Sequence, residues 1–262
     1  MTGLRAAVAT EFLKSRRSRV PWGIAVGFSI APLIMGLFMV ILKDPEAARA
    51  LGLIGAKAQL TAGTADWPTY WSLLGQAVTV GGSILFAFLT AWVFGREFAD
   101  RTVRGLLASA TPRRTIVIAK AVVISAWGAA ISGWILLLSL AIGGLIGLPG
   151  WSGSAAIQAL ATIGFAALLT IALQGMTAFF AGVGHGYIAP LGWAVAMVAA
   201  SQVLAVLGWG AWFPWAVPAI LAGAGGVAVE PVGPGGIALV VLAAVVGTIA
   251  TITWWERADQ TG

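Results

Sequence analysis

Long apolar runs, separated by short polar segments, follow one another along almost the whole chain. A helix that crosses a membrane needs about 20 mostly apolar residues. Runs of about this length or longer predict transmembrane helices over residues 21–42, 71–94, 115–148, 155–183, 187–207 and 237–255. The third run exceeds one bilayer thickness, so we expect it to tilt or to extend beyond the membrane. The pattern therefore predicts an all-α integral membrane protein of six spans, with residues 1–262 forming a single transmembrane domain.

Residues 1–20, ahead of the first run, have the pattern of an amphipathic helix. Leu4, Val8 and Phe12 fall on one side, and charged side chains cover the rest. Such a helix lies in the membrane interface, with its apolar side among acyl chains and its basic side towards the headgroups of anionic membrane lipids. The candidate interfacial residues are Glu11, Lys14, Arg16 and Arg17. The alternative is a disordered basic leader that only orients the first span.

Residues 95–114 form the densest block of charge between two apolar runs. A segment with this charge cannot cross a bilayer, so we expect it in water or at the membrane surface. Phe98, Val103 and Leu106 recur at helical spacing, which predicts a short amphipathic helix that Thr111-Pro112 ends. The charged members of the block are Arg96, Glu97, Asp100, Arg101, Arg104, Arg113 and Arg114.

Residues 208–236 are apolar but do not read as a straight span. Four prolines interrupt them, at Pro214, Pro218, Pro231 and Pro234. Backbone that is not helical is tolerated at membrane depth only where protein shields it. We therefore expect a re-entrant hairpin or a short outer helical segment before the sixth span.

The composition agrees with a chain solvated by lipid. Hydrophobic residues make up 60% of it and charged residues only 9%, whereas soluble domains carry about 25% charged residues. The net charge of +6 comes from basic residues that flank the apolar runs, so no nucleic-acid partner is expected. There is no cysteine, which excludes disulfides and thiolate metal sites.

The distribution of basic residues predicts the orientation of the chain. Cytoplasmic loops of membrane proteins are enriched in Lys and Arg. If both termini are cytoplasmic, only Lys43, Arg49 and Lys57 of the 15 Lys and Arg residues lie outside. We therefore expect a multi-pass protein of the cytoplasmic (inner) membrane with both termini in the cytoplasm.

Groups able to carry out chemistry are scarce in the spans. His185 is the single histidine, and neither a catalytic set nor a metal site is predicted. Gln76, Gln174 and Gln202 could line a pathway, but hydrogen bonding between helices is the more common role of such residues. The pattern G-x-x-x-x-G-K-[ST] is missing, so we expect this chain to bind no cofactor and no ATP of its own.

Two stretches resemble a known family. The charged block resembles the inner loop of ABC-2 type permeases in its residues Gly95-Arg96-Glu97-Phe98, Thr102-Val103-Arg104, Pro112-Arg113-Arg114 and Lys120. The outer stretch Trp212-Phe213-Pro214-Trp215 is similar to the segment before the last span of the bacitracin-type members. The inner-loop motif is the more specific of the two.

The resemblance implies the transmembrane subunit of an ATP-driven exporter. Such a subunit would pair with a second permease subunit, here expected to be identical, and with a separate cytoplasmic ABC ATPase that binds ATP and Mg. Residues 95–114 would then be a cytoplasmic coupling helix between spans two and three. The expected contacts to the ATPase are Glu97, Asp100, Arg101, Arg104, Arg113 and Arg114. Pairing of Glu97 with Arg101 at i,i+4, which only stabilises the helix, is an equal alternative.

The apolar spans favour an amphipathic or hydrophobic cargo, such as an antibiotic, a peptide or a lipid-like compound, and export of this kind confers antibiotic or multidrug resistance. The second hypothesis is a membrane assembly or immunity protein without transport activity. An intramembrane enzyme ranks last, because the residues for chemistry are missing.

Overall fold

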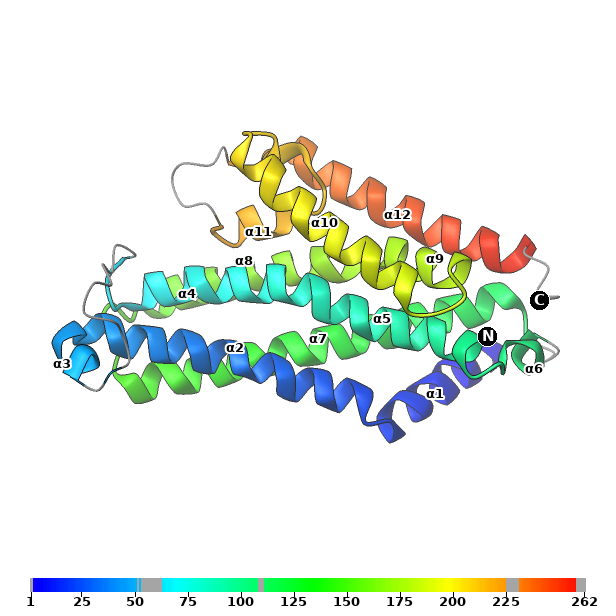
Figure 1. Cartoon of the computed structure of the whole chain (residues 1–262), viewed down its shortest axis with the longest axis horizontal. Helices are drawn as coiled ribbons and strands as arrows, with labels where there is room; N and C mark the ends of the chain where they lie inside the picture. Colours follow the sequence, from blue (N-terminus) through cyan, green and yellow to red (C-terminus); the bar gives the residue numbers. More distant parts are fainter. Residues whose placement is uncertain (1, 51, 53–62, 108–110, 225–230, 258–262) are drawn as a thin grey trace.

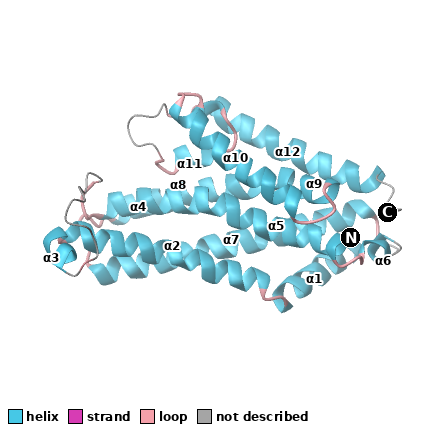
Figure 2. Ribbon diagram, viewed as in Figure 1, coloured by secondary structure: helices cyan, strands magenta, loops and turns pink. Residues whose placement is uncertain are grey.

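The computed structural model describes residues 2–50, 52, 63–107, 111–224 and 231–257. In this part of the chain every regular element is helical (Figures 1 and 2). The elements are α1 (Thr2–Arg17), α2 (Val20–Lys43), α3 (Pro45–Ala50), α4 (Trp67–Gln76), η1 (Ala77–Gly81), α5 (Gly82–Ala99), α6 (Val103–Leu107), α7 (Arg113–Ile146), α8 (Gly153–Ala172), α9 (Gln174–Val183), α10 (Ile188–Val206), η2 (Gly210–Trp212), α11 (Val217–Leu221) and α12 (Pro234–Arg257).

Six helical stretches are long and apolar enough to cross a membrane, which confirms the all-α, six-span prediction. They are Val20–Lys43, Trp67–Ala99, Arg113–Ile146, Gly153–Val183, Ile188–Val206 and Pro234–Arg257. The second comprises α4, η1 and α5, and the fourth comprises α8 and α9. The largest boundary shifts are in the second stretch, which begins four residues earlier and ends five residues later than expected.

The spans run side by side along the long axis of the molecule (Figure 1). Both chain termini lie at one end, together with α1 and α6, and we call this the terminus end. The opposite end, the far end, carries α3 and the start of α4. Helix α7 packs against α1 and α2, whereas α12 packs against α9. Large apolar side chains such as Leu145, Ile188 and Val206 remain exposed, as expected for surfaces solvated by lipid.

Two spans depart from regular α-helix. At both sites a polar side chain hydrogen-bonds to a backbone carbonyl. In the second span, η1 is a π-helical turn in which the Thr79 hydroxyl donates to the Gly75 carbonyl at 2.8 Å. In the fourth span, α8 ends at Ala172 and α9 begins at Gln174. There the Gln174 Nε2 donates to the Thr170 carbonyl at 3.2 Å. These side chains satisfy carbonyls that lipid cannot hydrogen-bond.

The charged segment 95–114 is not one helix. The stretch Gly95–Ala99 forms the last turn of α5, a break follows, α6 is only five residues long, and α7 begins at Arg113. The break is a Schellman motif: the Thr102 N–H donates to the Glu97 carbonyl at 2.9 Å, and the Arg101 N–H donates to the Phe98 carbonyl at 3.1 Å. The expected single coupling helix is therefore corrected to a helix end, a left-handed joint at Arg101 and a short separate helix.

The segment before the sixth span contains the expected short helical structure. It folds into η2 and α11, and α11 packs against α8 with Val217 and Pro218 buried. Residues 225–230, part of the predicted 208–236 segment, lie outside the described residues. Re-entry into the membrane stays a prediction.

Candidate functional site

Five ionisable side chains from three helices meet at the terminus end. Glu11 and Lys14 come from α1, Arg96 and Glu97 from the last turn of α5, and Lys120 from the second turn of α7. Lys120 is 0% exposed, and Glu11 and Glu97 are each 4% exposed. We call these five residues the charge cluster. Buried charges occur where they are paired, so this arrangement ties the three helices together.

Lys120 is the centre of the charge cluster. Its ammonium Nζ lies 2.7 Å from Glu97 Oε1 and 2.6 Å from Glu97 Oε2. The same nitrogen is 3.2 Å from Glu11 Oε2 and donates to the Val93 carbonyl at 2.8 Å. A lysine ammonium has three protons to donate and no acceptor. Two carboxylates and one carbonyl therefore use its whole donor capacity.

Glu11 connects α1 to the other two helices. Its Oε1 accepts from Lys14 Nζ at 2.7 Å, and its Oε2 accepts from Arg96 Nη2 at 2.7 Å and from Lys120. Burial alone would raise the pKa of the Glu11 carboxyl, but the charges of Lys120, Lys14 and Arg96 outweigh it and hold the pKa below its usual value. Glu11 is therefore ionised at neutral pH and remains attached to its cations.

The part of the polar side of α1 that carries Glu11 and Ser15 faces the protein, which corrects the expected placement of Glu11 towards lipid headgroups. Glu11 and Ser15, one helical turn apart, are both buried, and the Trp127 indole on α7 donates to the Ser15 hydroxyl at 2.9 Å. By contrast, Phe12 and Leu13 are exposed. The orientation of this side of α1 is determined by the ion pair between Glu11 and Lys120, which lie 109 residues apart in sequence, and not by the local apolar pattern. The location of α1 in a membrane interface stays a prediction.

Arg96 is fixed from a second side as well. Its guanidinium carbon lies 4.5 Å from the centre of the Trp92 ring, one turn earlier on α5. With Lys14 and Lys120 it makes three cations against two carboxylates in the charge cluster. Removing one partner of a buried ion pair costs about 3–5 kcal/mol, because the other charge is left uncompensated. The charge cluster is thus a strong connection between α1, α5 and α7.

The other candidate coupling residues are spread around the charge cluster. Asp100 and Arg101 are exposed at the end of α5, and Arg114 is exposed in the first turn of α7. The Arg113 guanidinium donates to the Trp255 carbonyl at 3.1 Å, at the last turn of α12. Arg104 lies in α6, but its side chain is outside the described part of the structure.

Arg101 does not stand one helical turn after Glu97 as the sequence alternative required. It lies beyond the end of α5 in a left-handed conformation with φ of 56°. Glu97 instead pairs with Lys120 inside the bundle. A direct contact between the buried Glu97 carboxylate and a soluble partner does not fit this geometry, and the residue is better described as holding α5 on α7.

An aromatic group packs beside the charge cluster. Phe98 on α5 contacts His185 and Trp254 edge-on, with ring centroids 5.2 and 6.0 Å apart. His185 lies in the turn between α9 and α10 in a left-handed conformation with φ of 49°. A Cβ atom on Gly95 would lie 2.8 Å from the Gly186 carbonyl oxygen, so this turn touches the α5 backbone. The terminus end therefore joins α5, α9, α10 and α12.

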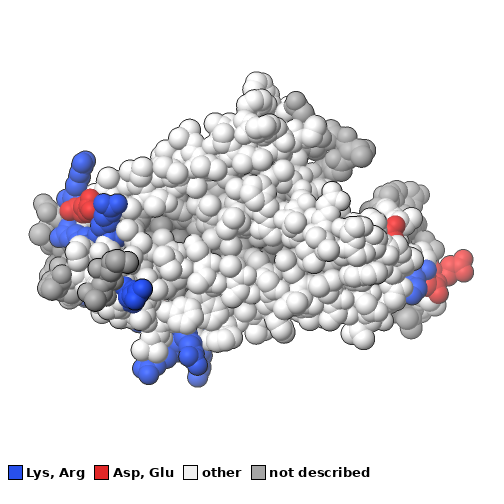
Figure 3. All heavy atoms as spheres, turned by 180° about the vertical axis from the view of Figure 1, so that it is seen from behind, with Lys and Arg blue, Asp and Glu red and all other residues white. Residues whose placement is uncertain are grey.

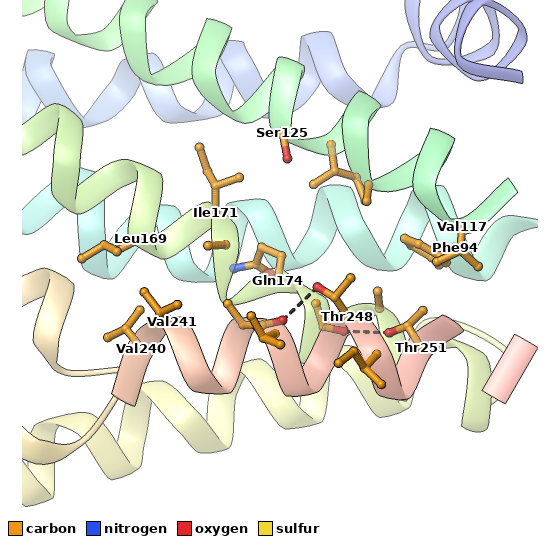
Figure 4. Close-up of a pocket in the computed structure, with 18 residues that line it drawn as sticks. Phe94, Val117, Ser125, Leu169, Ile171, Gln174, Val240, Val241, Thr248 and Thr251 are labelled. Carbon is orange, nitrogen blue, oxygen red and sulfur yellow. Dashed lines mark hydrogen bonds between the residues drawn. The ribbon is translucent and has the colours of Figure 1, made fainter. Parts of the chain in front are cut away.

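The three candidate pathway glutamines do not meet at one site. Gln174 lines a cavity of about 390 Å³ between α5, α7, α8, α9 and α12 (Figure 4). Gln202 lines a separate cavity of about 210 Å³ with Thr79 and Ser83, next to η1. Gln76 donates to the Ser72 hydroxyl at 3.4 Å. Their role in a pathway stays a prediction. Among the described residues no group of three or more His, Asp or Glu could hold a metal ion.

Lys120 is the functional candidate that sequence reasoning undervalued. In the sequence it is only the last residue of the inner-loop motif, beyond the charged block 95–114, and is not among the candidate site residues. The available signal was a lone lysine inside an apolar run, since a charge there needs a partner. The identity of that partner could not be read from the sequence.

Comparison with known families decides the class of protein. A family model described as ABC-2 family transporter protein matches residues 7–201. The chain belongs to the ABC-2 transporter family. The match includes α1 from its second turn, the whole charge cluster, the first four spans and α10 as far as Ser201. Members of the ABC-2 family are the membrane components of ABC transporters, so this chain is a multi-pass permease subunit that works with an ABC ATPase component. A search of curated proteins found none that matches.

Proposed function

We propose that this ABC-2 permease subunit is half of an ATP-driven exporter in the cytoplasmic membrane. Two copies would form the transport path, with both termini in the cytoplasm and two ATPase subunits beneath them. The ATPases would bind ATP and Mg, and this chain would bind neither. The outer Trp212-Phe213-Pro214-Trp215 stretch supports assignment to the bacitracin-type branch.

The charge cluster carries this proposal. It joins α1, α5 and α7 through buried ion pairs. The joint at Asp100–Thr102 follows its residues Arg96 and Glu97 in the chain, and α6 begins directly after this joint. A soluble partner that presses on α6 and on the exposed Asp100, Arg101 and Arg114 would push on the ends of spans two and three. Because the charge cluster holds those ends to one another, they would tilt as a unit. Closure of the ATPases on binding nucleotide would then shift the equilibrium between an inward-facing and an outward-facing state of the transport path.

The described cavities support an apolar cargo. The 390 Å³ cavity is lined mostly by aliphatic side chains, with Gln174, Thr248 and Thr251 as polar exceptions (Figure 4). Its size falls in the range of small-molecule sites, about 300–1,000 Å³. A hydrophobic or amphipathic compound that carries a few hydrogen-bonding groups fits this lining better than a highly charged one.

The test is reconstitution of the purified chain in lipid nanodiscs with a candidate ABC ATPase. We expect a stable complex with ATP hydrolysis. Reversing two exposed charges, Asp100→Arg and Arg114→Glu, should dissociate the complex or uncouple it, because both would face the ATPase. Arg257→Glu, an exposed arginine at the end of α12, is the matched control and should leave the complex intact. Normal assembly by the double reversal variant would refute the proposed contact surface. Failure of any ATPase to bind would favour the non-transporting assembly or immunity protein.

A further inference from the structure

An apolar groove opens between α1, α2 and α7 at the terminus end. Its volume is about 640 Å³. We call it the tryptophan groove, and the residues that define it are Phe12, Trp22, Val26, Ser29, Trp127 and Trp134. Trp22 and Trp134 are 53% and 50% exposed, so the groove opens to the surroundings of the bundle.

The polar atoms of the tryptophan groove are already used by the protein. The Trp22 indole donates to the Arg16 carbonyl at 3.1 Å, and the Trp134 indole donates to the Ser29 hydroxyl at 2.9 Å. The Trp127 indole is bound to Ser15. Trp22 also meets Trp127 edge-on, with centroids 5.1 Å apart. The rings are therefore fixed, and what they offer an occupant is hydrocarbon surface.

Three arginines lie at the junction of α1 and α2, just before Trp22, which lines the tryptophan groove. Arg16, Arg17 and Arg19 are all exposed at the junction of α1 and α2, and the Trp22 bond to the Arg16 carbonyl connects them to the groove wall. Among the described residues no carboxylate pairs with any of the three, whereas Lys14 is bound to Glu11. Figure 3 shows an isolated blue group at the lower edge of the molecule over this junction, with no red atoms beside it.

We propose that the tryptophan groove and these three arginines form a binding site for one anionic phospholipid. An acyl chain would lie in the groove, and the phosphate would lie against Arg16, Arg17 and Arg19. The guanidinium group matches a phosphate in bidentate geometry, and a basic patch next to buried hydrocarbon supplies the two attractions that stable lipid binding needs.

The length of the groove suits a chain in the leaflet at the terminus end. Trp127 and Trp134 are seven residues apart on α7, which corresponds to about 10 Å along the helix axis, a third of the roughly 30 Å hydrocarbon core. The groove thus runs from the arginines towards the bilayer centre, as the acyl chain of a phospholipid does. A bound lipid would pack on Phe12 and Trp127. Glu11, next to Phe12 in the chain, pairs with Arg96 on α5, and Ser15 accepts a hydrogen bond from Trp127 on α7.

A second copy of the chain is the weaker occupant. A twofold contact is made by the same patch on both subunits, so it would bring two sets of three arginines towards each other. The residues that line the groove include no acidic side chain to neutralise them. An anionic lipid brings the missing negative charge itself.

The experiment is native mass spectrometry of the purified full chain, preloaded with equal amounts of phosphatidylglycerol and phosphatidylcholine of the same acyl chains. The wild type should retain one phosphatidylglycerol in preference to phosphatidylcholine. The triple variant Arg16→Gln, Arg17→Gln, Arg19→Gln should lose at least tenfold of this retention. The matched control Arg5→Gln, Arg114→Gln, Arg257→Gln removes the same charge from exposed positions and should retain the lipid.

A second variant tests the hydrocarbon half of the site. Ala126→Leu with Ala130→Leu fills the groove from α7 and should reduce retention even though the arginines remain. Inorganic phosphate in millimolar excess should not displace the lipid. Circular dichroism melting verifies that each variant is folded.

The proposal is overturned by equal retention of the two lipids, by retention in the triple variant, or by displacement by inorganic phosphate alone. It is also overturned if filling the groove dissociates a dimer and leaves lipid retention unchanged, since the occupant would then be a second copy. None of these results depends on ATPase binding, so the site and the proposed exporter function can fail separately.

Discussion

At the residue scale, Lys120 carries a positive charge where its side chain has no exposed surface. Its position is tolerable because Glu97 and Glu11 neutralise it and its ammonium donates a further hydrogen bond to the Val93 carbonyl. Buried ion pairs of this kind fix one arrangement of their helices, because losing either partner leaves an uncompensated charge. The stability of the terminus end should therefore respond strongly to single changes in the charge cluster.

Lys120→Met should lower the free energy of unfolding by about 3–5 kcal/mol, because two buried carboxylates lose a shared partner. Adding Glu97→Gln should recover part of this loss, with a coupling energy of roughly 0.5–3 kcal/mol, since the second change removes one of the stranded charges. Unfolding in detergent followed by tryptophan fluorescence measures both. The control is Ile188→Ala, at a side chain that is 90% exposed. Additive losses in the double variant would show that the two residues do not act together.

Glu11 should make the protein sensitive to acid. Its pKa in the folded chain lies below the usual value of about 4.3, so its stabilising contribution is complete above that pH and is lost as the pH falls through the folded pKa. Melting temperatures measured between neutral pH and pH 3 should fall on the acid side. Glu11→Gln should be less stable at neutral pH and should show a flatter acid limb. An unchanged acid limb in this variant would assign the acid loss to other carboxylates.

The residue scale is where prediction from the sequence reached least far. The charged block itself is visible, but the partners of Glu11 on other helices lie 85 and 109 residues away, and nothing local indicates them. The local apolar pattern of α1 even indicated the opposite orientation for Glu11. Burial of an ion pair depends on three helices meeting, which is a property of the tertiary structure.

At the element scale, the ends of the helices follow two patterns. Gly147, Gly208 and Gly223 adopt the left-handed conformation after α7, α10 and α11, where glycine is the usual residue. At the terminus end, Arg101 and His185 adopt it instead, with φ of 56° and 49°. Side chains in this conformation are strained, and such strain is often found at functional positions. The joint after α5 therefore has local backbone strain at a charged residue, Arg101.

Arg101→Gly should raise the free energy of unfolding by a few tenths to about 1 kcal/mol, because glycine adopts the left-handed conformation without a side-chain clash. Arg101→Asn also tolerates this conformation and removes the charge, so it separates backbone strain from electrostatics. Both variants should weaken stimulation of the partner ATPase if the arginine contacts it. Unfolding and ATP hydrolysis measured on the same samples check the two effects. A destabilised Arg101→Gly would contradict the strain argument.

Elements were more predictable than their interruptions. The spans follow from hydropathy, because lipid requires about 20 apolar residues and a satisfied backbone for each crossing. The joint at Asp100–Thr102 was missed because it has no glycine or proline to indicate it. The π-helical turn Ala77–Gly81 was also missed, because the glycine at its end does not distinguish a π-helical turn from an ordinary helical one.

At the scale of the whole molecule, the two ends of the bundle are stabilised in different ways. The terminus end depends on buried ion pairs. At the far end Trp67 contacts Trp71 and Trp151, with ring centroids 5.2 and 4.8 Å apart, and its indole lies against Gly143 on α7. Aromatic packing allows little adjustment, whereas the ion pairs join the ends of α1, α5 and α7 into one unit that can move together. The far end should therefore remain fixed while the terminus end changes.

Gly143→Ala tests the rigidity of the far end. A Cβ atom there would lie 2.5 Å from Trp67 Cη2, and the buried ring has little room to move, so we expect a loss of about 1–3 kcal/mol. Gly144→Ala is the control, because a Cβ atom at this neighbouring position meets nothing within 4 Å. Chemical unfolding and hydrogen exchange at the start of α4 provide the measurements. Equal stability of the two variants would show that the Trp67 ring moves aside easily and that the far end is not rigid.

The interruption of the fourth span at Leu173 has a mechanical consequence. Helix α9 is attached to α12 by the bond from the Thr251 hydroxyl to the Gly175 carbonyl, while α8 packs with α11. The two halves of the fourth span are therefore held mainly by different neighbouring helices. A displacement of the α9–α10 turn should be felt more strongly in α12 than in α8.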